Sequence, residues 1–150
     1  MPQSFAQLHV HVVFSIKGRA PLIDPGWERR LYDVIGGILK TVKCSLLAGG
    51  GIEDHVHLLI SLARDISVSD VVRNVKTDSS KWIHEDLAGL ANSHWQTGYS
   101  AFSVSQSQLP AVRRYIANQN EHHRRQSYQD EVRELLRLHG IEPDEEHMWD

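Results

Sequence analysis

The segment Asp54-His55-Val56-His57-Leu58-Leu59-Ile60 places two histidines inside an apolar run with the pattern of a buried strand. Side chains alternate across a strand, so His55 and His57 share one face and Val56 lies on the other. Two neighbouring imidazoles can hold one divalent metal ion. In apolar surroundings they need such an ion or a hydrogen-bond partner. The segment therefore indicates either a metal site or a pair of hydrogen-bonded core histidines.

Strand and helix patterns follow on both sides of this segment. Alternating or β-branched runs predict four strands, at 7–16, 44–48, 52–62 and 99–105. Apolar residues at helical spacing predict four helices, at 25–43, 68–83, 110–125 and 129–138. The glycines at 49–51 predict a turn between the second and third strands. This order predicts an α+β fold with a ferredoxin-like (split β-α-β) antiparallel sheet and appended C-terminal helices.

A second group of functional side chains lies in the helix predicted after Pro110. Tyr115 and Gln119 are four residues apart, so a helix places them on one face. An activated phenol is a nucleophile, and an amide oxygen is a ligand for hard metal ions. A half-buried tyrosine beside a surface glutamine gives the same spacing. The pair indicates a nucleophile and a ligand only in combination with the two histidines.

Composition restricts the class of protein. We expect one domain over residues 1–150, long enough to bury a core. No apolar run is long enough to span a membrane, and no signal-peptide pattern is present. Cys44 is the only cysteine, which excludes an intramolecular disulfide and fits a reducing cytoplasm.

The net charge of −3 is unevenly distributed along the chain. Residues 1–126 carry 14 Lys and Arg against 11 Asp and Glu, whereas residues 127–150 carry 2 against 8. The larger part is therefore weakly basic, and the acidic end is a separate feature. Such an acidic end is typical of a solvated helix face. The overall charge does not exclude a nucleic-acid partner.

In combination these residues resemble the single-tyrosine transposases of the HUH (His-hydrophobe-His) endonuclease superfamily. That group comprises the TnpA-like enzymes of small bacterial insertion sequences and their relatives associated with repetitive extragenic palindromes (REP). The likeness extends in order over nearly the whole chain, through His55-Val56-His57, 80–83, 95–105, 115–123, Glu131, Leu135, Leu136, 140–141 and Trp149. Lys17-Gly18-Arg19 departs from it, because many relatives carry a tyrosine at the middle position.

The resemblance implies a metal-dependent transposase that cleaves and rejoins single-stranded, hairpin-bearing DNA. His55, His57 and Gln119 would hold Mg²⁺ or Mn²⁺, and Tyr115 would form a 5′-phosphotyrosine. It also implies a homodimer, often with the tyrosine helix of one subunit completing the site of the other. The basic residues that could contact DNA are Lys17, Arg19, Arg73, Lys76, Lys81, Arg113 and Arg114.

Other assignments remain open. His9 and His11 form a second His-x-His on the first predicted strand, and His11 could orient a ligand, contact phosphate or be a hydrogen-bonded core residue. His122 and His123 could contact DNA or lie solvated at a helix end. The alternative functions are a domesticated protein that binds hairpin DNA without transposition, and a phosphoesterase that uses metal-bound water.

Overall fold

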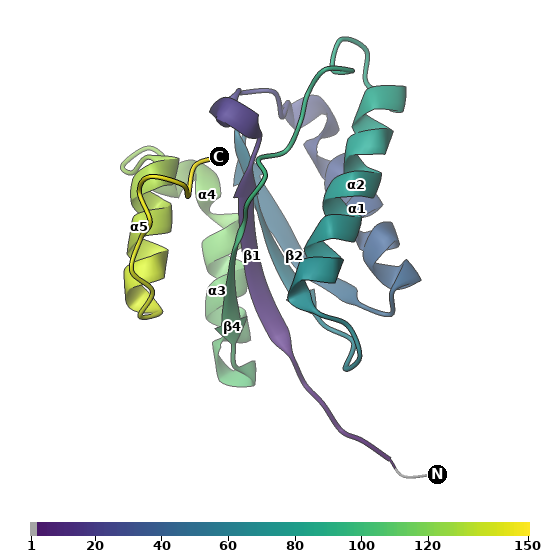
Figure 1. Cartoon of the computed structure of the whole chain (residues 1–150), viewed down its shortest axis with the longest axis vertical. Coiled ribbons are helices and arrows are strands. Elements are labelled where there is room, and N and C mark those ends of the chain that lie inside the picture. Colours follow the sequence, from purple (N-terminus) through teal and green to yellow (C-terminus); the bar gives the residue numbers. More distant parts are fainter. Residues whose placement is uncertain (1–2) are drawn as a thin grey trace.

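A four-stranded antiparallel sheet with the order β2-β3-β1-β4 forms the centre of the molecule (Figure 1). The structure is a computed structural model that describes residues 3–150. The strands are β1 (His9–Ser15), β2 (Ser45–Ile52), β3 (His55–Ser61) and β4 (Ser100–Val104). With β1 and β3 in the middle, the topology confirms the α+β, ferredoxin-like prediction.

Helices cover both faces of the sheet (Figure 1). One face carries α1 and α2, and the other carries α3, α4 and α5. The helices are α1 (Pro25–Thr41), α2 (Val68–Asp86), α3 (Leu109–Ala117), α4 (Gln119–His122) and α5 (Tyr128–Leu138), with short 3₁₀ turns η1 (Lys17–Arg19) and η2 (Gln106–Gln108). Among residues 3–150, none of these helices combines the length and apolar character that a membrane crossing requires.

Alternation along β3 divides the apolar core into two layers. Val56, Leu58 and Ile60 are fully buried against α1 and α2. His55 and His57 are equally buried but face the opposite layer, under α3 to α5. The predicted division of this strand into an apolar face and a histidine face is therefore confirmed, and the histidine face lies inside the protein.

Helix starts follow their capping residues. Asp24 accepts a hydrogen bond from the amide of Gly26 at the start of α1, and Pro25 occupies the first helical position. Ser67 accepts one from the amide of Asp70 at the start of α2, which caps that helix. Local sequence thus sets these two boundaries.

The prediction of a turn at 49–51 is wrong, because these glycines belong to β2 and the turn falls at Glu53-Asp54. Their role is close approach between backbones. A Cβ on Gly50 would lie 2.6 Å from the carbonyl oxygen of Ile116 in α3, and one on Gly51 would lie 2.1 Å from that of His55. A side chain at Gly50 would therefore push α3 away from the sheet.

The helix predicted over 110–125 is interrupted at Asn118, whose φ of −101° and ψ of 24° are not helical. Its amide still bonds the carbonyls of Arg114 and Tyr115, which ends α3 and starts α4. After this break Gln119 is buried beside His55, with 1% of its surface exposed. The break therefore turns the second half of the segment toward the histidine strand.

Candidate metal centre and nucleophile

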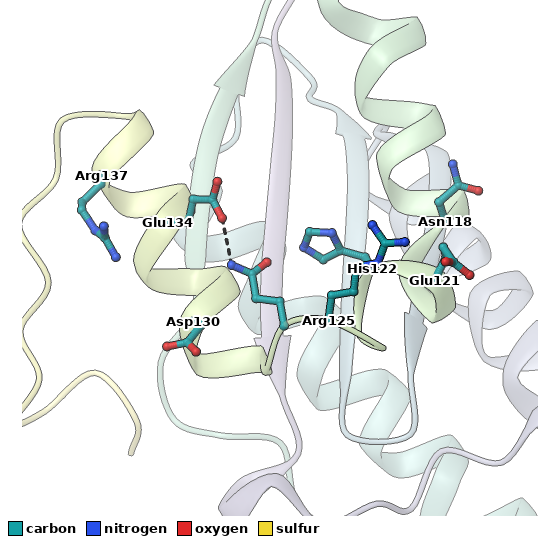
Figure 2. Close-up of a pocket in the computed structure, with 8 residues that line it drawn as sticks. Asn118, Glu121, His122, Arg125, Asp130, Glu134 and Arg137 are labelled. Atoms are coloured by element: carbon teal, nitrogen blue, oxygen red, sulfur yellow. Dashed lines mark hydrogen bonds between the residues drawn. The ribbon is translucent and has the colours of Figure 1, made fainter.

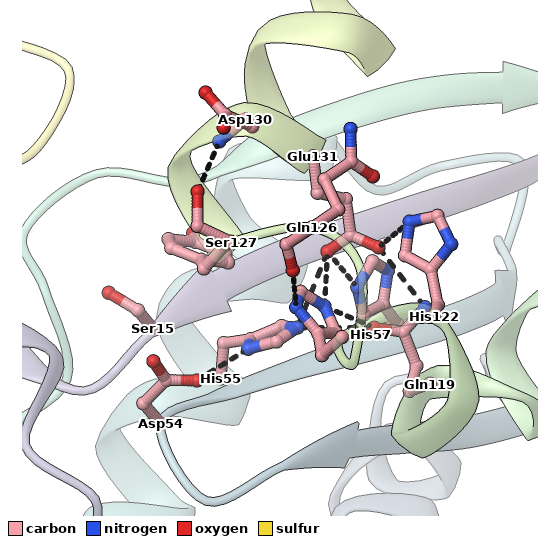
Figure 3. A network of polar contacts seen from close by, with 12 residues as sticks. Ser15, Asp54, His55, His57, Gln119, His122, Gln126, Ser127, Asp130 and Glu131 are labelled. Atoms are coloured by element: carbon pink, nitrogen blue, oxygen red, sulfur yellow. Dashed lines mark hydrogen bonds and ion pairs between the residues drawn. The ribbon is translucent and has the colours of Figure 1, made fainter.

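Four potential metal ligands converge on the inner face of β3 (Figure 3). One ligand atom from each of His55, His57, His123 and Glu131 lies within 4.8 Å of every other. β3 supplies the first two, the end of α4 supplies His123, and α5 supplies Glu131. The Glu131 carboxylate is central: Oε1 lies 3.0 Å from Nε2 of His57, 3.0 Å from Nε2 of His123 and 3.4 Å from Nε2 of His55.

Each imidazole is held through its other ring nitrogen. Nδ1 of His55 lies 2.7 Å from the Asp54 carboxylate, and Nδ1 of His57 lies 2.7 Å from Nε2 of His11. Nδ1 of His123 donates to the carbonyl of Gln126 at 2.8 Å. Partners of this kind fix the orientation of metal-binding histidines. All three histidines therefore direct Nε2 into the cluster, and His11 belongs to it as a hydrogen-bonded, 4%-exposed partner.

The donor set fits a cation. The Gln126 carbonyl can only accept, so a neutral His123 carries its proton on Nδ1 and turns a lone pair toward Glu131. The amide oxygen of Gln119 lies 3.0 Å from this same Nε2 and 3.2 Å from Nε2 of His55. Acceptors facing one another in a buried site require a proton or a metal ion between them. Imidazole, carboxylate and amide ligands together suit a divalent transition metal.

Burial and close contacts within the cluster shift the pKa values of its members. Burial raises the pKa of Glu131, but the contacts of its carboxylate with His123, His55 and His57 outweigh burial and hold the pKa well below its usual range. Burial lowers the pKa of His55, yet hydrogen bonds to Asp54 and Glu131 prevail and raise it to about 9. Burial, with His57, lowers the pKa of His11 to about 3. Glu131 is therefore an anion, and His11 is a neutral partner.

Tyr115 reaches the same carboxylate from α3. Its hydroxyl donates a short hydrogen bond to Oε2 of Glu131 and lies 3.3 Å from Nε2 of His122. The amide nitrogen of Gln119 also donates to Oε2, at 3.2 Å. Burial and the adjacent Glu131 raise the pKa of Tyr115 above its usual range. The phenol is thus protonated and positioned directly beside the cluster.

An open, charged cavity of about 1000 Å³ lies between α4 and α5 (Figure 2), and its lining residue His122 contacts the Tyr115 hydroxyl. His122, which lines the cavity, links it to the cluster because its Nε2 lies 3.4 Å from Oε2 of Glu131. The remaining lining residues are Asn118, Glu121, Arg125, Gln126, Asp130, Glu134 and Arg137. A polar ligand in this cavity can therefore contact His122, the neighbour of the Tyr115 hydroxyl.

The structure brings Tyr115, His55, His57 and Gln119 together, as the sequence predicts for a common site. The other predicted contacts are dispersed over three places: Lys17 and Arg19 in η1, Arg73, Lys76 and Lys81 on α2, and Arg113 and Arg114 on α3. α2 lies on the face of the sheet opposite the cluster (Figure 1).

Two of these basic side chains have partners within the fold. Nζ of Lys76 donates to the carbonyls of Gln96 and Gly98 at 2.7 and 2.6 Å. Nη1 of Arg113 donates to the carbonyl of Leu47 at 2.7 Å, which ties α3 to β2. Their assignment to DNA contact stays a prediction, because each has a structural use as well.

Sequence reasoning did not assign His123 and Glu131 to the metal site. One signal for Glu131 is present in α5, where it falls on the same face as Tyr128, Val132 and Leu135. An acid on an apolar helix face requires a partner. The partner itself is invisible locally, because His57 is 74 residues away in the chain.

Comparisons with known proteins relate this chain and its fold to transposases. Residues 4–119 match the model of the IS200-like transposase family. The ISDra2 transposase TnpA of Deinococcus radiodurans is 24% identical over 122 residues, which cover 77% of this chain and 86% of that protein.

Two solved structures share the fold. One is a proposed transposase from Deinococcus radiodurans R1, with a TM-score of 0.65, 22% identity, and coverage of 79% of this chain and 98% of that one. The other is a REP-associated tyrosine transposase bound to a REP hairpin, with a TM-score of 0.61, 15% identity, and coverage of 82% and 73%. The family match spans most of the chain, including the histidine strand, Tyr115 and Gln119, so this protein belongs to the IS200-like transposase family.

Proposed function

We propose that this protein cleaves and rejoins single-stranded DNA through a covalent bond between Tyr115 and a 5′-phosphate. The observation that carries the proposal is that Glu131 binds both the Tyr115 hydroxyl and the converging histidines. A nucleophile and a metal-ligand set thereby share one carboxylate. Membership of a transposase family supports the same class of reaction.

The residues that would hold the metal are His55, His57 and Gln119, with Glu131 and His123 as further ligands. When bound, Mg²⁺ or Mn²⁺ would supply Lewis acidity to a phosphate oxygen. Imidazole ligands favour Mn²⁺ over Mg²⁺, which prefers oxygen. We therefore expect Mn²⁺ to bind more tightly.

The chain's own groups supply the covalent step. The oxygen of Tyr115 attacks phosphorus, its proton passes to the Glu131 oxygen that already accepts its hydrogen bond, and the bond from phosphorus to the 3′ oxygen breaks. The departing 3′ oxygen takes up a proton and leaves as a hydroxyl. A later attack by a 3′-hydroxyl reverses these changes and releases Tyr115. The phosphotyrosine conserves the bond energy, so rejoining needs no nucleotide cofactor.

The proposed substrate is single-stranded DNA that carries imperfect hairpins. Support comes from a structural neighbour described as bound to a REP hairpin. Lys17, Arg19, Arg114 and the cavity residue Arg125 would contact phosphates, which makes binding salt-dependent.

Tyr115 and its carboxylate partner belong to the same chain, and this supports a site assembled within one subunit. Homodimerisation remains a prediction, and on this geometry it is not needed to complete the cluster. In a dimer each subunit would then carry an independent site.

A denaturing gel with radiolabelled single-stranded hairpin DNA taken from the flanks of the gene tests the proposal. Wild-type protein with Mn²⁺ should form a shifted protein–DNA adduct, and Tyr115→Phe should bind the DNA but form none. Tyr128→Phe is the matched control, because Tyr128 lies near His55 but donates its hydrogen bond to Gln96 rather than to Glu131. Cleavage without an adduct would favour a phosphoesterase, and binding without cleavage would favour a domesticated hairpin-binding protein.

A further inference from the structure

A second cavity, of about 500 Å³, lies between β4, α3 and α5 and also reaches Tyr115. Its volume falls in the range of about 300–1,000 Å³ typical of small-molecule sites. The residues that define its character are His11, Phe102, Val112, Tyr115, Leu138 and His139. Unlike the charged cavity, it is lined mainly by aromatic and aliphatic side chains.

An aromatic pair forms part of the wall. The rings of Phe102 and His139 stack with centroids 4.3 Å apart and planes inclined by 28°. His139 is fixed by its Nδ1, which donates to the carbonyl of Leu135 at 2.7 Å. Beside it Leu138 has 72% of its surface exposed, the second most exposed large apolar residue after Phe5 among residues 3–150. A preformed aromatic surface with an exposed apolar rim suits a flat, partly apolar ligand.

Tyr115 lines the aromatic cavity, and its contact partner His122 lines the charged cavity. A DNA strand whose phosphate reaches the Tyr115 hydroxyl must place its neighbouring nucleotides beside that residue. The charged cavity offers Arg125 and Arg137 to the sugar-phosphate backbone. The aromatic cavity offers stacking and van der Waals contact, which bases use in single-stranded DNA recognition.

We propose that the cavity lined by Phe102 and His139 binds one of the two nucleobases that flank the attacked phosphate. Stacking alone tolerates every base. However, the cavity wall also contains Gln108, Ser103 and Ser105, whose side chains can hydrogen-bond to a base edge. The cavity therefore selects the base at one position next to the cleavage site. This inference rests on the proposed function and deepens it.

Trapping adducts from single-stranded DNA that carries a constant hairpin from the flanks of the gene, with random sequence at every other position, tests the inference on many possible cleavage sites at once. Protein is incubated with Mn²⁺ and the DNA pool, covalent adducts are isolated under denaturing conditions, and the DNA flanking each junction is sequenced. Ala111→Trp, on the exposed side of α3, fills the cavity. Ala117→Trp is the matched control, because it is exposed on the same helix but does not line the cavity.

Wild type and Ala117→Trp should enrich one base, or one class of base, at a single flanking position. Ala111→Trp should lose that enrichment, and its adduct yield should fall by roughly 10- to 100-fold, the cost of one lost stacked base. His139→Ala should weaken the same preference, with His147→Ala as its exposed control, and unchanged melting temperatures would show that the variants fold.

An unselected base distribution at both flanking positions in wild type would overturn the inference, as would the same enrichment in Ala111→Trp. These results leave the proposed function intact, because adducts still form. A wild-type protein that forms no adduct with any DNA would overturn the proposed function, and the base site would fall with it.

Discussion

The Glu131→Gln variant tests whether the Glu131 carboxylate is part of a metal centre. Glutamine keeps the volume of the side chain but removes the negative charge and replaces one acceptor oxygen with a donor. In the structure Glu131 is 1% exposed and contacts Nε2 of both His57 and His123 at 3.0 Å. It also accepts hydrogen bonds from Gln119 and Tyr115. With His55 and His122, each 3.4 Å from the carboxylate, one substitution therefore alters the surroundings of six side chains.

The magnitude follows from this burial. Removing one partner of a buried, charged pair costs about 3–5 kcal/mol, because the other group stays buried without compensation. We expect the metal-free Glu131→Gln protein to lose an amount in this range from its free energy of unfolding. Loss of residues that merely orient metal ligands weakens affinity about 10- to 100-fold. The proposed role of Glu131 as a direct ligand predicts that its substitution lowers Mn²⁺ affinity by an amount at or above the upper end of that range.

Urea unfolding followed by tryptophan fluorescence measures the first quantity, and calorimetric titration with Mn²⁺ measures the second. Glu134→Gln is the matched control, since Glu134 is one turn along the same helix, exposed, and bonded to Gln126. The control should stay within about 0.5 kcal/mol of wild type. If Glu131→Gln matches the control in both stability and Mn²⁺ affinity, the carboxylate is not part of a metal centre.

Three other outcomes follow from the packing. Gly50→Ala should lower the free energy of unfolding in urea by about 1–3 kcal/mol, because its Cβ would lie 2.6 Å from a carbonyl of α3. The control Gly37→Ala lies on an open helix face and should be stabilising. Equal changes in the free energy of unfolding would contradict the close approach of Gly50 to α3. Lys76→Met should cost about 2–3 kcal/mol through its lost bonds to three loop carbonyls, whereas a melting temperature equal to that of wild type would show that these bonds do not stabilise the fold. When the Tyr115→Phe and His57→Ala variants are mixed and exchange subunits, cleavage should not be recovered, because the proposed site takes both residues from the same chain. Recovered cleavage would show that one site combines residues of two subunits.

The sequence predicts those helices and strands that are determined by residues close together in the chain. Alternation in β3 predicts which residues face the histidine layer, and the caps at Asp24 and Ser67 predict where two helices begin. The glycines at 49–51 were misread because a strand that needs close backbone approach and a turn both favour glycine. Only the position of α3 distinguishes these two uses.

The candidate site was predictable only where its residues lie close together in the sequence. His55 and His57 share a strand face, which alternation predicts. Tyr115 and Gln119 are predicted on one face of a continuous helix, but the break at Asn118 places them in α3 and α4, so that only their closeness in sequence is predictable. Glu131 joins them only because α5 packs across the sheet. Its position on an apolar helix face indicates a buried partner but does not identify one.

Identifying the residue that becomes covalently attached to DNA tests directly whether Tyr115 is the nucleophile. Trypsin places the four tyrosines in four different peptides, and Tyr115 begins the peptide Tyr115–Arg124, whereas Tyr128 lies in Gln126–Arg133. Wild-type protein is incubated with Mn²⁺ and single-stranded DNA, the DNA is trimmed with nuclease, and the peptides are analysed by mass spectrometry. Tyr115 alone should carry a nucleotide phosphate, and no tyrosine should carry one after chelation of the metal. Attachment to another tyrosine, or cleavage that leaves every tyrosine unmodified, would contradict it.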